Sequence, residues 1–304
     1  LLVRQPSSGG NMSGMKKFLS IAALVLAALY ILSQTALCLM VSFSDADRGS
    51  YLYGKWYFAA KPFVIDRGRL IKRGDTVTLG TYQYSADGSA APIKWTVISV
   101  GKESVQLLST DIIDVGAYNT GQTETVWSRS LMRDWLNNGF FDAAFSDDEK
   151  KSIQLRTTVT DYGNNTNSDL GIDYSDDYVT IPYVTDIKTI DPLYVGNRFM
   201  RGKLTPYALK RFNEAVSADK DVHRTGGTDP EEWAEVVWVD GKGNGTWWLR
   251  SPGYQTAAAA HVDTSGKAWN ADYFGMSYTL LQTDDPSIGI RPMIYVDISY
   301  LIND

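Results

Sequence analysis

Alternation of hydrophobic and polar positions is the first regular pattern in the main part of the chain. Residues 75–84, 93–100 and 105–109 alternate with a period of two, which favours half-buried β-strands. The breaks between them carry Asp-Gly at 87–88 and Gly-Lys at 101–102, and such pairs occur in turns that join antiparallel strands. The pattern therefore predicts an antiparallel meander.

Short helices are predicted where capping residues precede apolar residues at helical spacing. Ser128 or Ser130 can cap a first helix, which is expected to stop at the Asn-Asn-Gly run 137–139. Ser146 and Glu149 match the S-x-x-E pattern of a capping box and start a second helix. We expect two separate helices in this part of the chain.

The later part of the chain is predicted to contain one more helix and one hairpin. A Thr-Pro pair starts a helix over 205–216, because proline fits the first helical position. A turn signal at 264–266 joins two short strands into a hairpin. The small residues of 254–260 and the polar residues of 270–286 predict loops on either side of it.

Two unusual apolar stretches stand out, TWWLRSPG at 246–253 and GIRPMIYV at 289–296. Side chains alternate along a strand, so Trp247 and Trp248 must face opposite sides of a sheet. Arg250 shares its side with Trp248, where an aromatic ring or a carboxylate can shelter the guanidinium. We expect two core strands in which the structural residues are Trp247, Trp248, Arg250, Gly289 and Arg291.

Residues 161–177 are rich in Asp and Asn and predict a polar, acidic loop. Such oxygen ligands suit calcium, but Gly163, Thr166 and Ile172 stand where a calcium-binding EF-hand loop needs other residues. We therefore expect a solvated loop and no cofactor, with calcium as the open alternative.

The amino-terminal region predicts export. A Met-Lys-Lys start followed by apolar residues is typical of a signal peptide or an uncleaved membrane anchor, with small residues that suit cleavage after Ala46. The expected organisation is an upstream extension over 1–14, the signal peptide or anchor over 15–46, a linker or leading strand over 47–70 and a single domain over 71–304. The protein is then secreted or held at the cell surface, and it meets the membrane only through this segment.

Composition narrows the function further. The formal net charge of −6 argues against a nucleic-acid partner. The only cysteine, Cys38, lies in the apolar leader, so thiol chemistry and cysteine-zinc sites are not expected in the domain. Nine Trp and eighteen Tyr suit a β-rich fold and a surface that binds carbohydrate or protein.

Several motifs together resemble a family of bacterial domains of unknown function found in exported proteins of Firmicutes. The matching segments are 92–97, 118–120, 127–137, 145–149, 247–253 and 289–292. This family is similar to the C-type-lectin-like fold of formylglycine-generating enzymes. The resemblance implies an α+β fold of antiparallel strands, two to three short helices and long loops. Formylglycine-generating enzymes act through cysteines, which this domain lacks.

The leading hypothesis is a non-catalytic recognition domain, exported or on the cell surface. Aromatic and short polar side chains on loops above a rigid sheet suit the binding of a glycan or a protein. The face would be built by residues 254–260 and 269–285. The candidate contacts are Trp269, Asn270, Tyr273, Phe274 and Tyr278.

Two alternatives remain. An exported hydrolase could use His261 with Ser251 or Ser265, or the acidic pair Asp284 and Asp285. A structural module of the cell envelope would use none of these residues and would bind no saturable ligand.

Overall fold

The computed structural model describes residues 23–30, 32, 64–66, 69–121, 125–162, 171–190, 199–218, 238–253, 257–269 and 281–303. The chain divides into two compact units, Leu1–Pro62 and Phe63–Asp304. In the first unit, residues 23–30 are helical with exposed side chains. Among the described residues, no helix has both the length and the apolar character needed to cross a membrane. Most of the predicted leader over 15–46 lies outside these residues.

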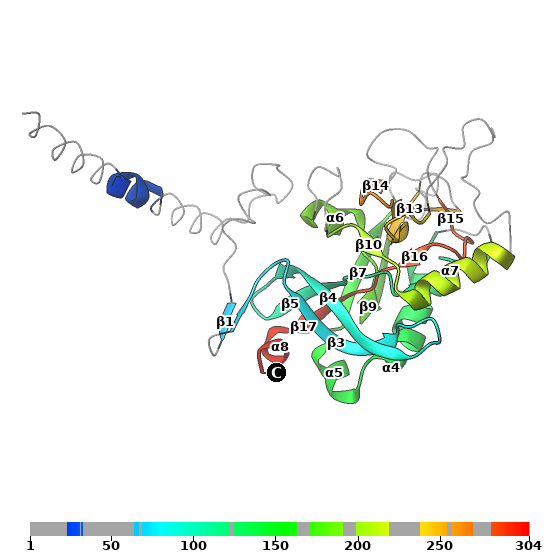
Figure 1. The fold of residues 1–304 in the computed structure, drawn as a ribbon, viewed down its shortest axis with the longest axis horizontal. Helices are drawn as coiled ribbons and strands as arrows, with labels where there is room; N and C mark the ends of the chain where they lie inside the picture. Colours follow the sequence, from blue (N-terminus) through cyan, green and yellow to red (C-terminus); the bar gives the residue numbers. More distant parts are fainter. Residues whose placement is uncertain are drawn as a thin grey trace, which may run out of the picture. The chain divides into compact units, whose positions relative to one another are not determined.

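The first of two larger sheets in the second unit is antiparallel throughout (Figure 1). Its strand order is β3-β4-β5-β17-β9. Three consecutive strands are neighbours in this order, so the predicted meander is confirmed. The bounds are β3 (Thr76–Gln83), β4 (Ala90–Val100), β5 (Ser104–Ser109), β17 (Met293–Asp297) and β9 (Val179–Thr180).

The second larger sheet brings the two motif stretches together. Its order is β14-β13-β12-β16-β6, with β15 paired to β13. Strands β12 and β16 are parallel, with Trp247 opposite Gly289. The predicted hairpin around 264–266 is confirmed by the antiparallel pairing of β13 with β14. The bounds are β6 (Asp114–Val115), β12 (Trp247–Pro252), β13 (Ala258–Val262), β14 (Ala268–Trp269), β15 (Leu281–Gln282) and β16 (Gly289–Ile290).

The stretch 289–296, predicted as one strand, is divided between the two sheets. Strand β16 belongs to the second sheet and β17 to the first, and Arg291 and Pro292 connect them. Proline has no N–H for a sheet ladder, which favours a break here. The carbonyl of Pro292 still accepts a hydrogen bond from the Ser109 N–H at 2.9 Å.

Two hydrophobic cores lie on opposite sides of β12. Trp248 packs in the core that also contains Trp95 and Trp127, whereas Trp247 packs in the core that contains Ile112 and Met293. Both indole side chains of the Trp-Trp pair are fully buried. The prediction that the pair faces opposite sides is confirmed.

The acidic segment contains a strand, which corrects the prediction of a loop over 161–177. Strand β7 (Arg156–Asp161) pairs with β8 (Ile172–Asp177) as a two-stranded antiparallel ribbon. Along β8 exposed residues alternate with less exposed ones. The inward carboxylates accept hydrogen bonds from protein donors: Asp173 from the Ser128 N–H at 2.9 Å, and Asp177 from the Trp127 indole at 2.9 Å. These bonds stabilise a strand that its composition alone disfavours.

The helical region after residue 126 continues beyond the predicted stop. Instead of ending the helix, residues 137–139 lie inside a π-helical turn that leads directly into another helix. The Asn137 side chain explains this, because its amide donates to the Val179 carbonyl at 2.8 Å and its oxygen accepts from the Val179 N–H at 3.0 Å. Asn137 therefore ties the helix interior to β9 and does not cap an end.

The predicted capping residues stand at the starts of three helices. Ser130 caps the first helix, Ser146 and Glu149 form the predicted capping box, and the Thr205 hydroxyl accepts from the Ala208 N–H at 3.1 Å. The third predicted helix is thereby confirmed, and α6 and α8 are additional. The bounds are η1 (Trp127–Arg129), α3 (Leu131–Asp134), η2 (Trp135–Phe140), α4 (Phe141–Ala144), α5 (Asp147–Ser152), α6 (Val184–Ile190), α7 (Pro206–Ala218) and α8 (Ile298–Asn303).

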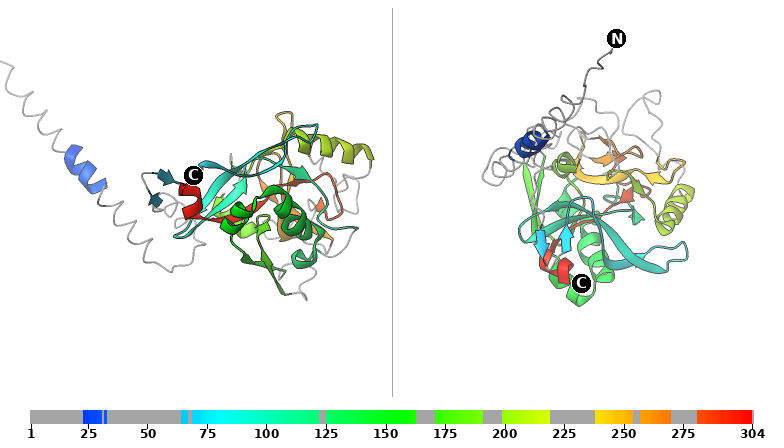
Figure 2. Two further views of the ribbon diagram at one scale, coloured as in Figure 1. Left: turned by 90° about the horizontal axis from the view of Figure 1, so that it is seen from below. Right: turned by 60° about the vertical axis from the view of Figure 1, so that its left-hand side comes forward.

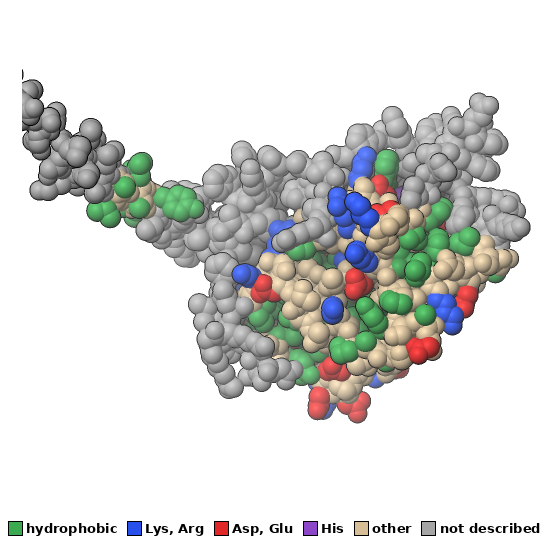
Figure 3. Space-filling model, viewed as in Figure 1, with side chains coloured by type: hydrophobic (Ala, Val, Ile, Leu, Met, Phe, Trp, Pro, Cys, Tyr) green, Lys and Arg blue, Asp and Glu red, His purple; other side chains and the backbone are tan. Residues whose placement is uncertain are grey.

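The second unit is thus an α+β fold with short helices and mainly antiparallel sheets, as predicted, and the β12–β16 pair is the parallel exception. The described residues also form two smaller strand pairs, β1 (Val64–Asp66) with β2 (Arg69–Ile71) and β10 (Gly202–Lys203) with β11 (Asn244–Gly245). Helix α7 lies beside the β3–β4 hairpin (Figures 1 and 2), where the Tyr207 N–H donates to the Tyr84 carbonyl at 2.8 Å. On the face seen in Figure 3, hydrophobic side chains are interspersed with acidic and basic ones.

Candidate functional site

Trp269, the first predicted ligand contact, lies at the end of β14 and is half-buried. Its indole N–H donates to Asp263 Oδ2 at 2.8 Å. The Lys267 ammonium lies 4.0 Å from the ring centroid. These two contacts hold the ring in one orientation. The other predicted contacts, Asn270, Tyr273, Phe274 and Tyr278, lie outside the described residues.

The predicted binding loop over 254–260 is partly wrong. Ala258, Ala259 and Ala260 form the first part of β13 and are fully buried between neighbouring strands. Alanine side chains are small enough to sit in a sheet that is covered on both faces. These three residues therefore support the sheet from within, and residues 254–256 lie outside the described residues.

His261 is buried in β13, opposite Trp248 on one side and Trp269 on the other. Its Nδ1 atom has no hydrogen-bond partner among the described residues. Burial lowers the pKa of His261 to about 4, although the charge of Asp263 opposes this shift. The imidazole is therefore neutral at pH 7.

The hydroxyl and carboxyl groups considered for a hydrolase have local hydrogen bonds. Ser251 Oγ accepts from the Val184 N–H at 2.8 Å, and Ser265 Oγ donates to Asp263 at 2.6 Å. Asp285 Oδ1 accepts from both the N–H and the hydroxyl of Ser287, at 2.8 and 2.6 Å. These bonds stabilise turns and the packing of α6 against β12.

Arg250 is sheltered by aromatic rings and a carboxylate, as its side of the strand predicts. Its guanidinium carbon lies 5.1 Å from the Tyr183 ring and 5.9 Å from the Trp127 ring, and its Nη2 lies 3.8 Å from Asp186. It also donates to Thr160 Oγ1 at 3.0 Å, whereas its Nε has no partner among the described residues. Burial raises the pKa of Asp186, and Arg250 opposes that rise.

Arg291 is buried and joins separate backbone segments. It makes five hydrogen bonds of 2.7–3.2 Å to the carbonyls of Ser109, Thr110, Phe199 and Met200. Burial lowers the pKa of Arg291 to about 9, so the side chain stays charged at pH 7. These contacts fit a structural role for Arg291.

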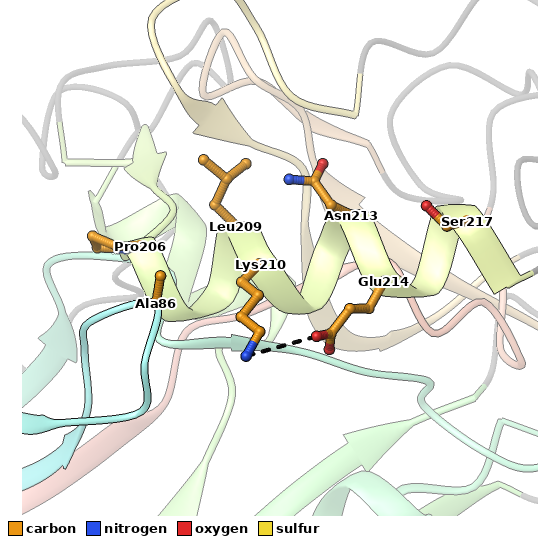
Figure 4. Close-up of a pocket in the computed structure, with 7 residues that line it drawn as sticks. All are labelled: Ala86, Pro206, Leu209, Lys210, Asn213, Glu214 and Ser217. Carbon is orange, nitrogen blue, oxygen red and sulfur yellow. Dashed lines mark ion pairs between the residues drawn. The ribbon is translucent and has the colours of Figure 1, made fainter.

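Helix α7 borders a hollow of about 500 Å³ (Figure 4). Its charged lining residues, Lys210 and Glu214, form an ion pair at 3.8 Å and are half exposed. Leu209 and Asn213 project from the same helix. Because the two charges are paired with each other, this hollow offers little that would select a ligand.

A second hollow of about 320 Å³ lies on the β3–β4 hairpin, and we call it the hairpin groove. Its lining includes Thr78, Tyr82, Tyr84, Lys94, Asp111 and Ile113. Thr78 and Lys94 are cross-strand neighbours, and Asp111 lies between β5 and β6. The groove therefore combines residues that are distant in the chain.

The Asp111 carboxylate is half-buried and has no hydrogen bond or ion pair within the described part of the chain. Burial raises the pKa of Asp111, and the positive charges of Arg291, Lys94 and Lys203 oppose that rise. The nearby Asp114 is different, because it accepts from the Tyr82 hydroxyl at 2.8 Å. The sequence analysis did not predict this groove. The one local indication of it was Asp111, an acidic residue directly before the apolar pair 112–113.

Comparison with known proteins gives a family for this fold. No curated protein and no solved structure matches the chain. A family model described as a domain of unknown function (DUF6273) matches residues 102–298, which is more than half of the 304 residues and includes TWWLRSPG and GIRP. The chain therefore belongs to the DUF6273 family.

Proposed function

We propose that the protein is a non-catalytic recognition domain that binds a glycan or a protein at the sheet edge that carries Trp269. The observation that carries this proposal is the fixed, half-buried indole, which Asp263 and Lys267 hold in place. A ring that is already oriented loses little conformational entropy when a ligand contacts it. Asn270, Tyr273, Phe274 and Tyr278 follow in the chain and are proposed to complete the contact surface.

The setting of this function is part of the proposal. We infer a bacterial, exported protein that is secreted or held at the cell surface through residues 15–46. A C-type-lectin-like arrangement is also proposed, and the Trp-rich strand β12 beside the Gly-x-Arg motif at 289–291 supports it. Such a fold would present the segments around β14 and β15 to a ligand.

The test is binding of the purified chain to a glycan array and to intact bacterial and host cells, with calcium and then with a chelator. We expect saturable binding that Trp269→Ala and Tyr273→Ala each weaken. Tyr174→Ala is the matched control, because Tyr174 is a 61% exposed aromatic residue on a different ribbon. Sensitivity to the chelator would support the calcium alternative.

Two outcomes would argue against the proposal. Absence of binding in every assay would favour a structural module of the cell envelope. Binding that Tyr174→Ala weakens as much as Trp269→Ala does would place the contact surface elsewhere.

A further inference from the structure

We infer that the hairpin groove is a second ligand site, and that it binds one neutral saccharide unit. It shares no lining residue with the Trp269 edge, so it stands apart from the proposed function. A volume of about 320 Å³ lies at the lower end of the range for small-molecule sites. The groove is therefore suited to a small ligand and not to a folded partner.

The apolar walls of the groove are held rigidly. The Tyr82 ring packs edge-on against Phe140 at 5.2 Å and Tyr207 at 6.2 Å between centroids, and its hydroxyl is fixed on Asp114. Pro92 adds exposed aliphatic surface, Ile113 lines the groove with 4% of its surface exposed, and Tyr84 is 40% exposed. Such surfaces match the C–H face of a sugar ring, and a preformed wall reduces the entropy lost on binding.

The polar groups of the groove select a ligand without net charge. Asp111 supplies an acceptor and Lys94 supplies a donor, and neither side chain has a hydrogen bond or ion pair among the described residues. Lys94 and Asp111 are the charged residues that line the groove, so a cation meets repulsion from Lys94 and an anion from Asp111. Arg291 and Lys203 also act on Asp111, but they do not line the groove. Neighbouring sugar hydroxyls can donate to a carboxylate and accept from an ammonium at the same time.

The half-buried carboxylate of Asp111, which has no partner within the described ranges, also favours this assignment. Burial penalises its charged form, which raises the pKa of Asp111. A ligand that donates hydrogen bonds to the Asp111 carboxylate removes part of that penalty. The charged carboxylate is therefore more stable in the occupied groove than in the empty one, which favours binding.

The test is ligand-observed NMR and calorimetry on the full chain with glucose, galactose, mannose and N-acetylglucosamine. At least one neutral sugar should bind saturably, and Asp111→Asn and Lys94→Met should each weaken it by about tenfold or more. Matched controls are Asp148→Asn and Lys151→Met, which remove an exposed ion pair on α5 and should leave the affinity unchanged. Trp269→Ala should also leave it unchanged, which separates this site from the proposed function.

Thermal unfolding of each variant checks that it is folded, and Tyr84→Ala provides a second test if Asp111→Asn is unstable. Absence of sugar binding would overturn the inference, as would binding that Asp111→Asn, Lys94→Met and Tyr84→Ala all leave intact. Binding of leucine in place of the sugars would assign the groove to a zwitterion and would also overturn it.

Discussion

The guanidinium carbon of Arg291 lies 4.8 Å from the centroid of the Trp247 ring. The two residues come from the two motif stretches, which the parallel pairing of β12 with β16 brings together. The same guanidinium binds backbone carbonyls of two further segments. The chain crosses from one sheet to the other at Arg291. The side chain of Arg291 therefore links this crossing point to the core around Trp247.

Replacing Arg291 by lysine should destabilise the protein by about 3 kcal/mol. An ammonium cannot reproduce five hydrogen bonds arranged around a planar guanidinium, so buried carbonyls would lose their donors. Urea unfolding measures the change. Arg201→Lys is the matched control, because Arg201 is exposed and donates to one carbonyl. Equal stability of the two variants would contradict a structural role for Arg291.

Gly289→Ala should cost about 2 kcal/mol or more of unfolding free energy. A Cβ at Gly289 would lie 2.8 Å from both the Thr246 carbonyl oxygen and Ile112 Cγ2. The carbonyl belongs to the backbone beside β12 and cannot move without disturbing the β12–β16 pairing. Gly241→Ala is the control, since a Cβ there meets nothing within 4 Å. A similar denaturation midpoint for both variants would show that the strand pair can widen.

Stability should fall as the pH is lowered from 7 to 4, in part because of His261. The folded protein holds the pKa of His261 at about 4, whereas the ordinary value is 6.5. Between these values the unfolded chain binds more protons, so acid favours unfolding by about 3 kcal/mol at pH 4. His261→Asn should lose less stability than the parent over this range in urea titrations. An identical pH dependence would mean that His261 titrates normally.

The capping box of α5 should contribute more through Glu149 than through Ser146. Ser146→Ala removes one cap and should cost about 1 kcal/mol. Glu149→Ala should cost more, because Glu149 also accepts from the Gly80 N–H at 2.7 Å and thereby ties α5 to β3. Thermal unfolding compares the two variants. A smaller effect at Glu149 would mean that the bond to Gly80 adds little.

Much of the fold follows from local signals in the sequence. The period-two runs and their turn residues predicted β3, β4 and β5, and the caps at Ser146 and Thr205 predicted two helix starts. These signals work because side-chain alternation and capping involve neighbours in the chain. Two of the wrong predictions, the stop at 137–139 and the loop over 161–177, depend on distant partners such as Val179 and Trp127.

The candidate sites divide in the same way. Trp269 could be proposed from its place beside a turn, because an aromatic residue near a hairpin has a recognisable local pattern. The hairpin groove could not be found in this way, because Lys94 and Asp111 line the same groove only after separate segments of the chain pack together. That Asp111 has no hydrogen-bond or ion-pair partner among the described residues is likewise a property of its surroundings.

The sequence by itself determined that Trp247 and Trp248 face opposite ways and that 75–109 forms a meander. Backbone geometry and periodicity are sufficient for each of these. Only the tertiary structure decided that β12 separates two cores, that Arg291 spans the crossing between the sheets and that a groove forms beside Asp111. These features arise from contacts between segments far apart in the chain, which a pattern of neighbouring residues does not encode.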